Sequence, residues 1–172
     1  TGVAFLPMTL MIIVFSVVAQ QLLARIGPRN VAVIGMVVAA VGVLLLRSIE
    51  PGGSYWTQLL PGIMVLAAGL GMTFVPLTLI ATGGVRNEDA GLASGLFNTS
   101  QQVGGALGLA ILTTVANSHT AGLLADSPGT PGLAEQASAT VAGYHLGFLV
   151  GSGLMLAGAV VLMAVIRKRD LA

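Results

Sequence analysis

The sequence contains no cysteine, and only 8% of its 172 residues are charged. The first absence excludes disulfides, thiolate nucleophiles and cysteine-ligated metals. Seven basic and six acidic residues leave a net charge of +1, so the chain has no charge excess with which to attract nucleic acid. What is abundant is apolar: 55% of the residues are hydrophobic and the mean hydropathy is +0.96. These values predict an all-α polytopic membrane protein whose first partner is the lipid bilayer.

Uncharged runs long enough to cross a hydrocarbon core of roughly 30 Å recur along the chain, and short polar segments separate them. We predict five transmembrane helices. The predicted spans are residues 2–23, 31–47, 58–82, 91–117 and 143–166, with an outer loop at residues 118–140. The chain begins with Thr1 and a hydrophobic run, without a basic leader, so we expect it to be part of a longer protein.

Basic residues favour one side of the predicted membrane topology. The excess of Lys and Arg on the cytoplasmic side sets the orientation of such proteins. The N-terminus is therefore expected outside and the C-terminus in the cytoplasm of a cell membrane. The two groups are Arg25, Arg29, Arg86, Arg167, Lys168 and Arg169 on the cytoplasmic side, and Arg47 alone outside.

The stretch 91–113 is uncharged yet rich in Gly, Ser, Asn, Thr and Gln. A helix would gather these residues on one side and Leu and Ile on the other. Asparagine and glutamine amides are costly against lipid, so this side is expected to face protein or a wet cavity. One row holds Ser94, Asn98, Gln101, Gly105 and Gly108, and the next holds Gly91, Gly95, Thr99, Gln102, Ala106 and Thr113.

The sequence contains no recognisable arrangement of catalytic residues. His119 and His145 lie far apart in sequence without nearby carboxylates, so hydrogen bonding at the membrane interface explains them better than metal binding. The glycine-rich segments lie inside apolar spans and lack the lysine of a phosphate-binding loop. We therefore expect no enzyme, no metal and no cofactor.

The first loop, AQQLLARIGPRN, resembles the loop motif of the major facilitator superfamily at Arg25, Gly27 and Arg29, although Ala24 replaces the motif's Asp. The run from Pro61 to Ile111 resembles the late helices of the fourteen-helix drug:proton antiporter branch more specifically. The conformational or packing positions that match are Arg25, Gly27, Arg29, Pro76, Gly91, Gly95, Gly104, Gly105 and Gly108.

This resemblance implies that the chain is the last five helices of a secondary active exporter, a proton-coupled drug or small-molecule antiporter that works by alternating access. Its partners would be the missing N-terminal helices and a small amphipathic substrate. No predicted span carries an Asp or Glu in its middle, so the missing helices would have to supply the carboxylate that uses the proton gradient.

The first, third and fourth spans would then line the central cavity. Interhelical hydrogen bonding is the alternative role for their polar side chains. The cavity candidates are Thr9, Ser16, Gln20, Thr73, Asn98, Gln101 and Gln102. Arg86, Glu88 and Asp89, just before the fourth span, are candidates for a cytoplasmic gate, and capping of the helix is the alternative.

Three further functions stay open on the sequence alone. The motifs concern helix packing more than substrate choice, so an exporter of an endogenous metabolite or lipid precursor would carry them too. A non-transporting membrane subunit or a truncated remnant of a transporter would also have such a sequence.

Overall fold

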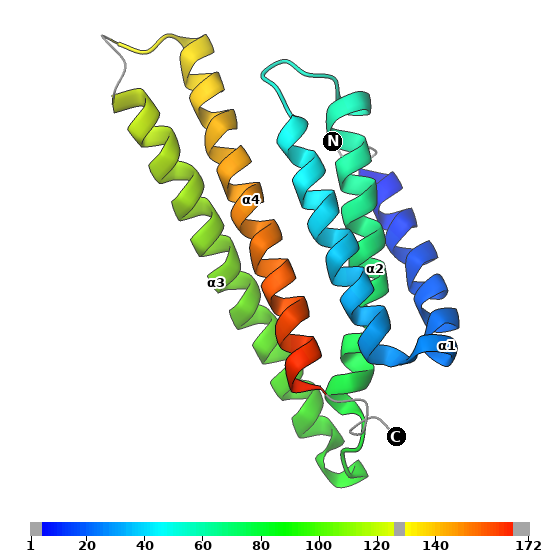
Figure 1. Ribbon diagram of the computed structural model, residues 1–172. Helices are drawn as coiled ribbons and strands as arrows, with labels where there is room; N and C mark the ends of the chain where they lie inside the picture. Colours follow the sequence, from blue (N-terminus) through cyan, green and yellow to red (C-terminus); the bar gives the residue numbers. More distant parts are fainter. Residues whose placement is uncertain (1–4, 126–129, 167–172) are drawn as a thin grey trace.

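The computed structural model describes residues 5–125 and 130–166, and every regular element in these two ranges is helical (Figure 1). Four helices are long and apolar enough to cross a membrane. They are α1 (Leu6–Leu45), α2 (Leu60–Thr82), α3 (Ala90–Ala125) and α4 (Leu133–Val165). Short helical turns, η2 (Leu46–Ser48), η3 (Tyr55–Leu59) and η4 (Asn87–Asp89), occupy the connections.

Helix α1 takes in most of the two spans that we expected at residues 2–23 and 31–47, of which residues 2–4 lie outside the described part of the chain, and it is bent at Gly27. Gly27 has φ 79° and ψ 160°, a backbone conformation that essentially only glycine adopts. Pro28 follows at once, and its fixed φ suits the first position of a helix. Because a single non-helical residue suffices for the turn, the break is much shorter than residues 24–30. The chain reverses direction there, so α1 has two antiparallel limbs (Figure 1).

We predict that Gly27→Ala destabilises this bend. A Cβ at Gly27 would meet no atom within 4 Å, so the effect arises from the backbone conformation alone. Holding alanine in this region should cost about 1–3 kcal/mol. The measurement is the apparent Tm of the purified protein in detergent, which should fall. An unchanged Tm would contradict the prediction, and Gly153→Ala, in open space at a helical position of α4, is the control.

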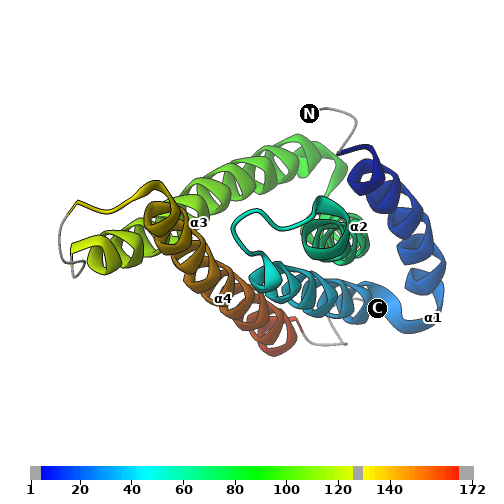
Figure 2. The ribbon, with the colours of Figure 1, turned by 90° about the horizontal axis from the view of Figure 1, so that it is seen from above.

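The best-packed part of the molecule is α2 between the two limbs of α1 (Figure 2). Ala19, Val31 and Met72 form its buried core. Gly71 of α2 lies against the first limb at Ile12. Gly69 lies against the second limb at Ala39. Close approach of helix backbones at small residues is the usual way in which helices pack in membranes.

Helices α3 and α4 form an antiparallel hairpin. Both extend into the segment where we expected a loop at 118–140, since α3 continues to Ala125 and α4 begins at Leu133. The prolines of this segment and most of its glycines lie within 128–132, whereas the flanking sequence is rich in Ala and Leu. Gly143 packs on Ala116, and the Thr120 hydroxyl donates to the Ala139 carbonyl over 3.2 Å.

Candidate functional site on helix α3

Helix α3 is the least covered of the four long helices. Ala116 is the one residue of this 36-residue helix that is buried. Asn98, Gln101 and Gln102 are all exposed, and none of them has a hydrogen-bond partner within the described part of the chain. Amides are costly on a membrane-spanning helix that faces lipid, because hydrocarbon offers them no hydrogen-bond partner.

The other polar side chains that we expected in a cavity lie on α1 and α2. Ser16 donates to the Ile12 carbonyl over 2.7 Å and to the Gly71 carbonyl of α2 over 3.3 Å. Thr73 donates to the Gly69 carbonyl over 2.7 Å, and its hydroxyl lies beside Gly35. These two hydroxyls thus lie in the packing between α1 and α2. Thr9 and Gln20 are exposed on the first limb of α1.

The glycines of the helices differ in their surroundings. Several glycines of α1, α2 and α4, such as Gly35, Gly69 and Gly143, lie against a neighbouring helix. The glycines of α3 do not, because a Cβ added to any of them would meet nothing within 4 Å; these are the motif positions Gly91, Gly95, Gly104, Gly105 and Gly108, together with Gly122. Pro76, by contrast, is fully buried inside α2.

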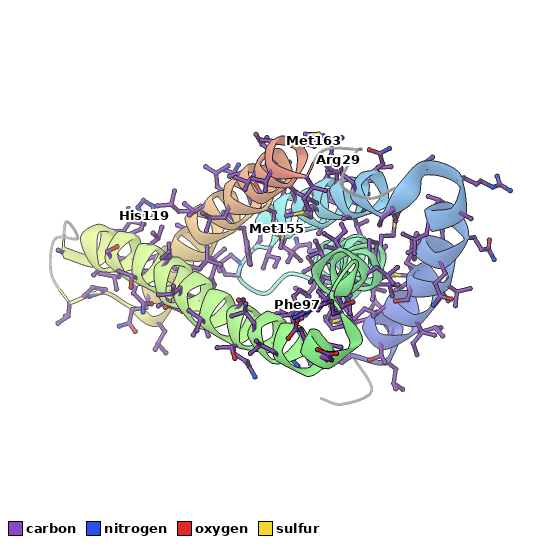
Figure 3. The ribbon with its side chains drawn as sticks, turned by 90° about the horizontal axis from the view of Figure 1, so that it is seen from below. Arg29, Phe97, His119, Met155 and Met163 are labelled. Carbon is purple, nitrogen blue, oxygen red and sulfur yellow. The ribbon has the colours of Figure 1, made fainter. Side chains whose placement is uncertain are left out.

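A cavity of about 520 Å³ lies between the second limb of α1, α2, α3 and α4. Met36 and Leu66 line it from α1 and α2, Gly104 and Gly108 from α3, and Met155 from α4. Met155 points into the space that these helices surround (Figure 3). The lining consists almost wholly of carbon, so the cavity suits an apolar occupant.

The bend of α1 and the α2–α3 connection lie at the same end of the bundle (Figure 1). There Arg86 pairs with Asp89 at 3.1 Å, but both side chains are well exposed, so the pair adds little stability. Glu88 is exposed beside them. The two carboxylates precede α3, where the positive end of the helix dipole favours them.

Arg29 joins the bend of α1 to the end of α4. Its Nη2 donates to the Met163 carbonyl over 2.6 Å, two residues before α4 ends at Val165 (Figure 3). A cation is favoured at this negative end of the helix dipole. The sequence marked Arg29 only as part of a loop motif, because a contact 134 residues away leaves no trace in local spacing.

The two histidines lie on different helices, His119 on α3 and His145 on α4. His145 lies 2.8 Å from the Ile49 carbonyl through its Nε2, which ties α4 to the α1–α2 connection. His119 is exposed near the far end of α3 (Figure 3). No group of metal-binding side chains occurs among the residues that the structure describes.

Long apolar helices, close contacts at small residues and a helix with exposed amides define a polytopic helical membrane protein. No protein-family model matches the chain. The chain is 40% identical to the puromycin resistance protein pur8 of Streptomyces alboniger, over 98% of this chain and 34% of that protein. It is 35% identical to the cephamycin export protein CmcT of Amycolatopsis lactamdurans, over 70% of this chain and 25% of that protein.

A third relative, the lincomycin resistance protein of Streptomyces lincolnensis, is 34% identical over 66% of this chain and 24% of its own length. The chain thus spans about a quarter to a third of these relatives. It belongs to the major facilitator superfamily of membrane transporters, as the motif resemblance predicts. These relatives are named as resistance and export proteins, and none of these names is that of an enzyme.

Proposed function

We propose that the chain is the C-terminal part of a secondary active exporter that moves small amphipathic drugs or antibiotics out of the cell in exchange for protons. The observation that carries this proposal is the match over 98% of the chain to a puromycin resistance protein. The exposed amides of α3 add a surface able to contact such substrates. Alternating access would move this bundle relative to the rest of the transporter.

Five membrane crossings are part of the proposal. The 40 residues of α1 would extend about 60 Å if straight, twice the thickness of a bilayer core. Divided at Gly27, each limb is about the length of one crossing. Arg25, Arg29 and Arg86 then belong to one end and Arg47 to the other, which supports an outside N-terminus and a cytoplasmic C-terminus in the cell membrane.

The interior surface of the bundle would be apolar and amide-lined, without an Asp or Glu in the middle of a span. Proton exchange requires a group that changes its charge within the membrane, and we assign it to helices outside this chain. Arg86, Glu88 and Asp89 would form part of a cytoplasmic gate, because their exposed side chains can meet basic loops when the cavity closes.

The test begins with the DNA upstream of Thr1. We expect about nine further apolar spans in frame, with a carboxylate in an early one, as the family resemblance implies. Cells that express this longer protein should accumulate less of a fluorescent cationic drug, and a protonophore should abolish the difference. The 172-residue chain alone should transport nothing. A stop codon or an unrelated domain upstream would contradict the proposal and favour a remnant or a non-transporting subunit.

A further inference from the structure

Helix α4 runs antiparallel to the second limb of α1, and a side chain joins the two helices towards each end (Figure 1). At the end where α1 bends, the Arg29 Nη2 donates to the Met163 carbonyl over 2.6 Å (Figure 3). At the other end, the His145 Nε2 lies 2.8 Å from the carbonyl of Ile49, which follows η2. A carbonyl only accepts, so Nε2 carries the proton in this bond. Each helix thus supplies a donor to the carboxyl end of the other.

Arg29 has the means to form a second bond to α4. Its Nε is buried, and no acceptor lies within hydrogen-bonding distance in the described part of the chain. The last carbonyls of a helix have no partner within that helix, and Met163 is two residues from the end of α4. A guanidinium is a planar fork of donors, so a small rotation would pair Nε with a further carbonyl of the same turn.

Between these two ends, α4 meets the second limb of α1 through apolar contacts at small residues. A Cβ on Gly151 would lie 3.8 Å from Val43, and a Cβ on Gly158 would meet only the tip of the Met36 side chain. Contacts of this kind are not directional, so they are similar after one helix slides along the other. A polar group within an apolar helix contact is what specifies the register of a helix pair.

Within the described chain, helix α3 is held mainly by α4. It contacts α4 far more than α2, and the two helices lie together beside α1 and α2 (Figure 2). Gly143 of α4 packs on Ala116, and the Thr120 hydroxyl donates to the Ala139 carbonyl. A shift of α4 along the second limb of α1 would therefore carry α3 and its exposed amides with it.

We propose that Arg29 and His145 are positioning residues, which set the register of α4 against α1 and thereby the place of the amides of α3. These amides are Asn98, Gln101 and Gln102. The proposal rests on the proposed function in taking the amides as part of a substrate surface. Arg29 and His145 act through backbone carbonyls, so the donor is required and the rest of the side chain is not.

Two pairs of substitutions separate the donor from the shape of the side chain. Arg29→Met and His145→Phe keep much of the volume and remove the donor, whereas Arg29→Lys and His145→Gln keep a donor. Arg25→Met is the control, because it removes a basic residue from the same bend, where the side chain is exposed. All variants are made in the longer protein, after replacement of any cysteine outside the 172 residues, which contain none.

Distances between two spin labels in lipid bilayers report where the helices lie. One label is attached at Ser54, in the α1–α2 connection, and the other at Ala137 of α4 or Ala121 of α3; all three positions are exposed. The parent should give one narrow distribution for each pair. Loss of both donors should broaden both distributions or move them by about 5 Å, roughly the rise of one helical turn. The donor-keeping variants and the control should match the parent.

Two results would overturn the proposal. Unchanged distributions after the loss of both donors would show that packing alone places α4. Equal changes in the donor-keeping and donor-free variants would show that the shape of the side chains matters and the donor does not. Each donor-free substitution is also measured singly, so that the comparison holds if the double variant does not reach the membrane. A single loss should broaden the distributions less than the double loss.

Drug efflux is recorded with the same proteins. Displaced amides should raise the KM of efflux roughly two- to tenfold, which corresponds to one lost hydrogen bond, with little change in kcat. The donor-keeping variants should restore the parent KM, and an unchanged KM after α3 has moved would contradict the last step of the proposal. The expected distances in a protein that exports nothing refute the transport function alone. Unshifted distances in an active exporter refute the positioning role alone.

Discussion

Replacing Gly69 with alanine is expected to separate α2 from α1 and to prevent most of the protein from folding stably. A Cβ at this position would lie 2.6 Å from the Cα of Ala39 and 2.6 Å from the carbonyl oxygen of Gly35. Both atoms belong to the backbone, so no rotation of a side chain can relieve the clash. Overpacking of this kind costs roughly 1–3 kcal/mol even where side chains can adjust, and here whole helices must move.

The measurements for Gly69→Ala are the yield of monodisperse protein in detergent and its apparent Tm. Both should fall sharply, and Gly69→Leu should give no folded protein. Gly153→Ala is the matched control, because it makes the same change in α4 where nothing lies within 4 Å. Equal stability of the Gly69 and Gly153 variants would show that the packing of α2 against Ala39 is not required for the fold.

The second large effect is expected at Gln102 of the longer protein. Gln102→Ala removes an exposed amide from α3 without disturbing a hydrogen bond in the described bundle. If the amide binds substrate, its loss should weaken affinity by about 0.5–1.5 kcal/mol, or roughly two- to tenfold. Efflux of at least some drugs should therefore fall while the amount of folded protein in the membrane stays near normal.

Efflux and membrane-inserted protein are measured on the same cells. The control is Gln136→Ala, which removes an amide from the first turn of α4, where it donates to the Pro131 carbonyl far from the polar side of α3. This control should transport as the parent does. If Gln102→Ala loses folded protein in proportion to efflux, the residue holds helices together and does not contact substrate.

Much of the fold could be predicted from hydrophobic runs, because a bilayer forces every apolar segment of sufficient length into a helix. The seams at Gly35, Ala39 and Gly143 were also predictable, since small residues one turn apart mark close helix contacts. The ends of the helices were predicted less accurately. Two predicted spans are a single bent α1, and the predicted loop at 118–140 is largely helical.

The sequence predicted which polar residues the candidate site contains, but not how these residues are placed relative to the other helices. Ser16, Thr73 and the amides of α3 are alike in the sequence as polar groups within apolar spans. The structure distinguishes them, because Ser16 and Thr73 bond within the packing of α1 and α2 while the amides of α3 are uncovered. Substrate contact stays a prediction for all the cavity candidates, which are Thr9, Ser16, Gln20, Thr73, Asn98, Gln101 and Gln102.

The sequence by itself determined that this protein spans a membrane, that its helices pack through glycine and alanine, and that its spans hold no central carboxylate. Each of these follows from local composition and spacing. Only the tertiary structure decided which glycines lie against a neighbouring helix and which do not. It also decided that Arg29 contacts the end of α4. Such facts depend on which helices become neighbours, and neighbours are chosen by packing among residues that lie far apart in the chain.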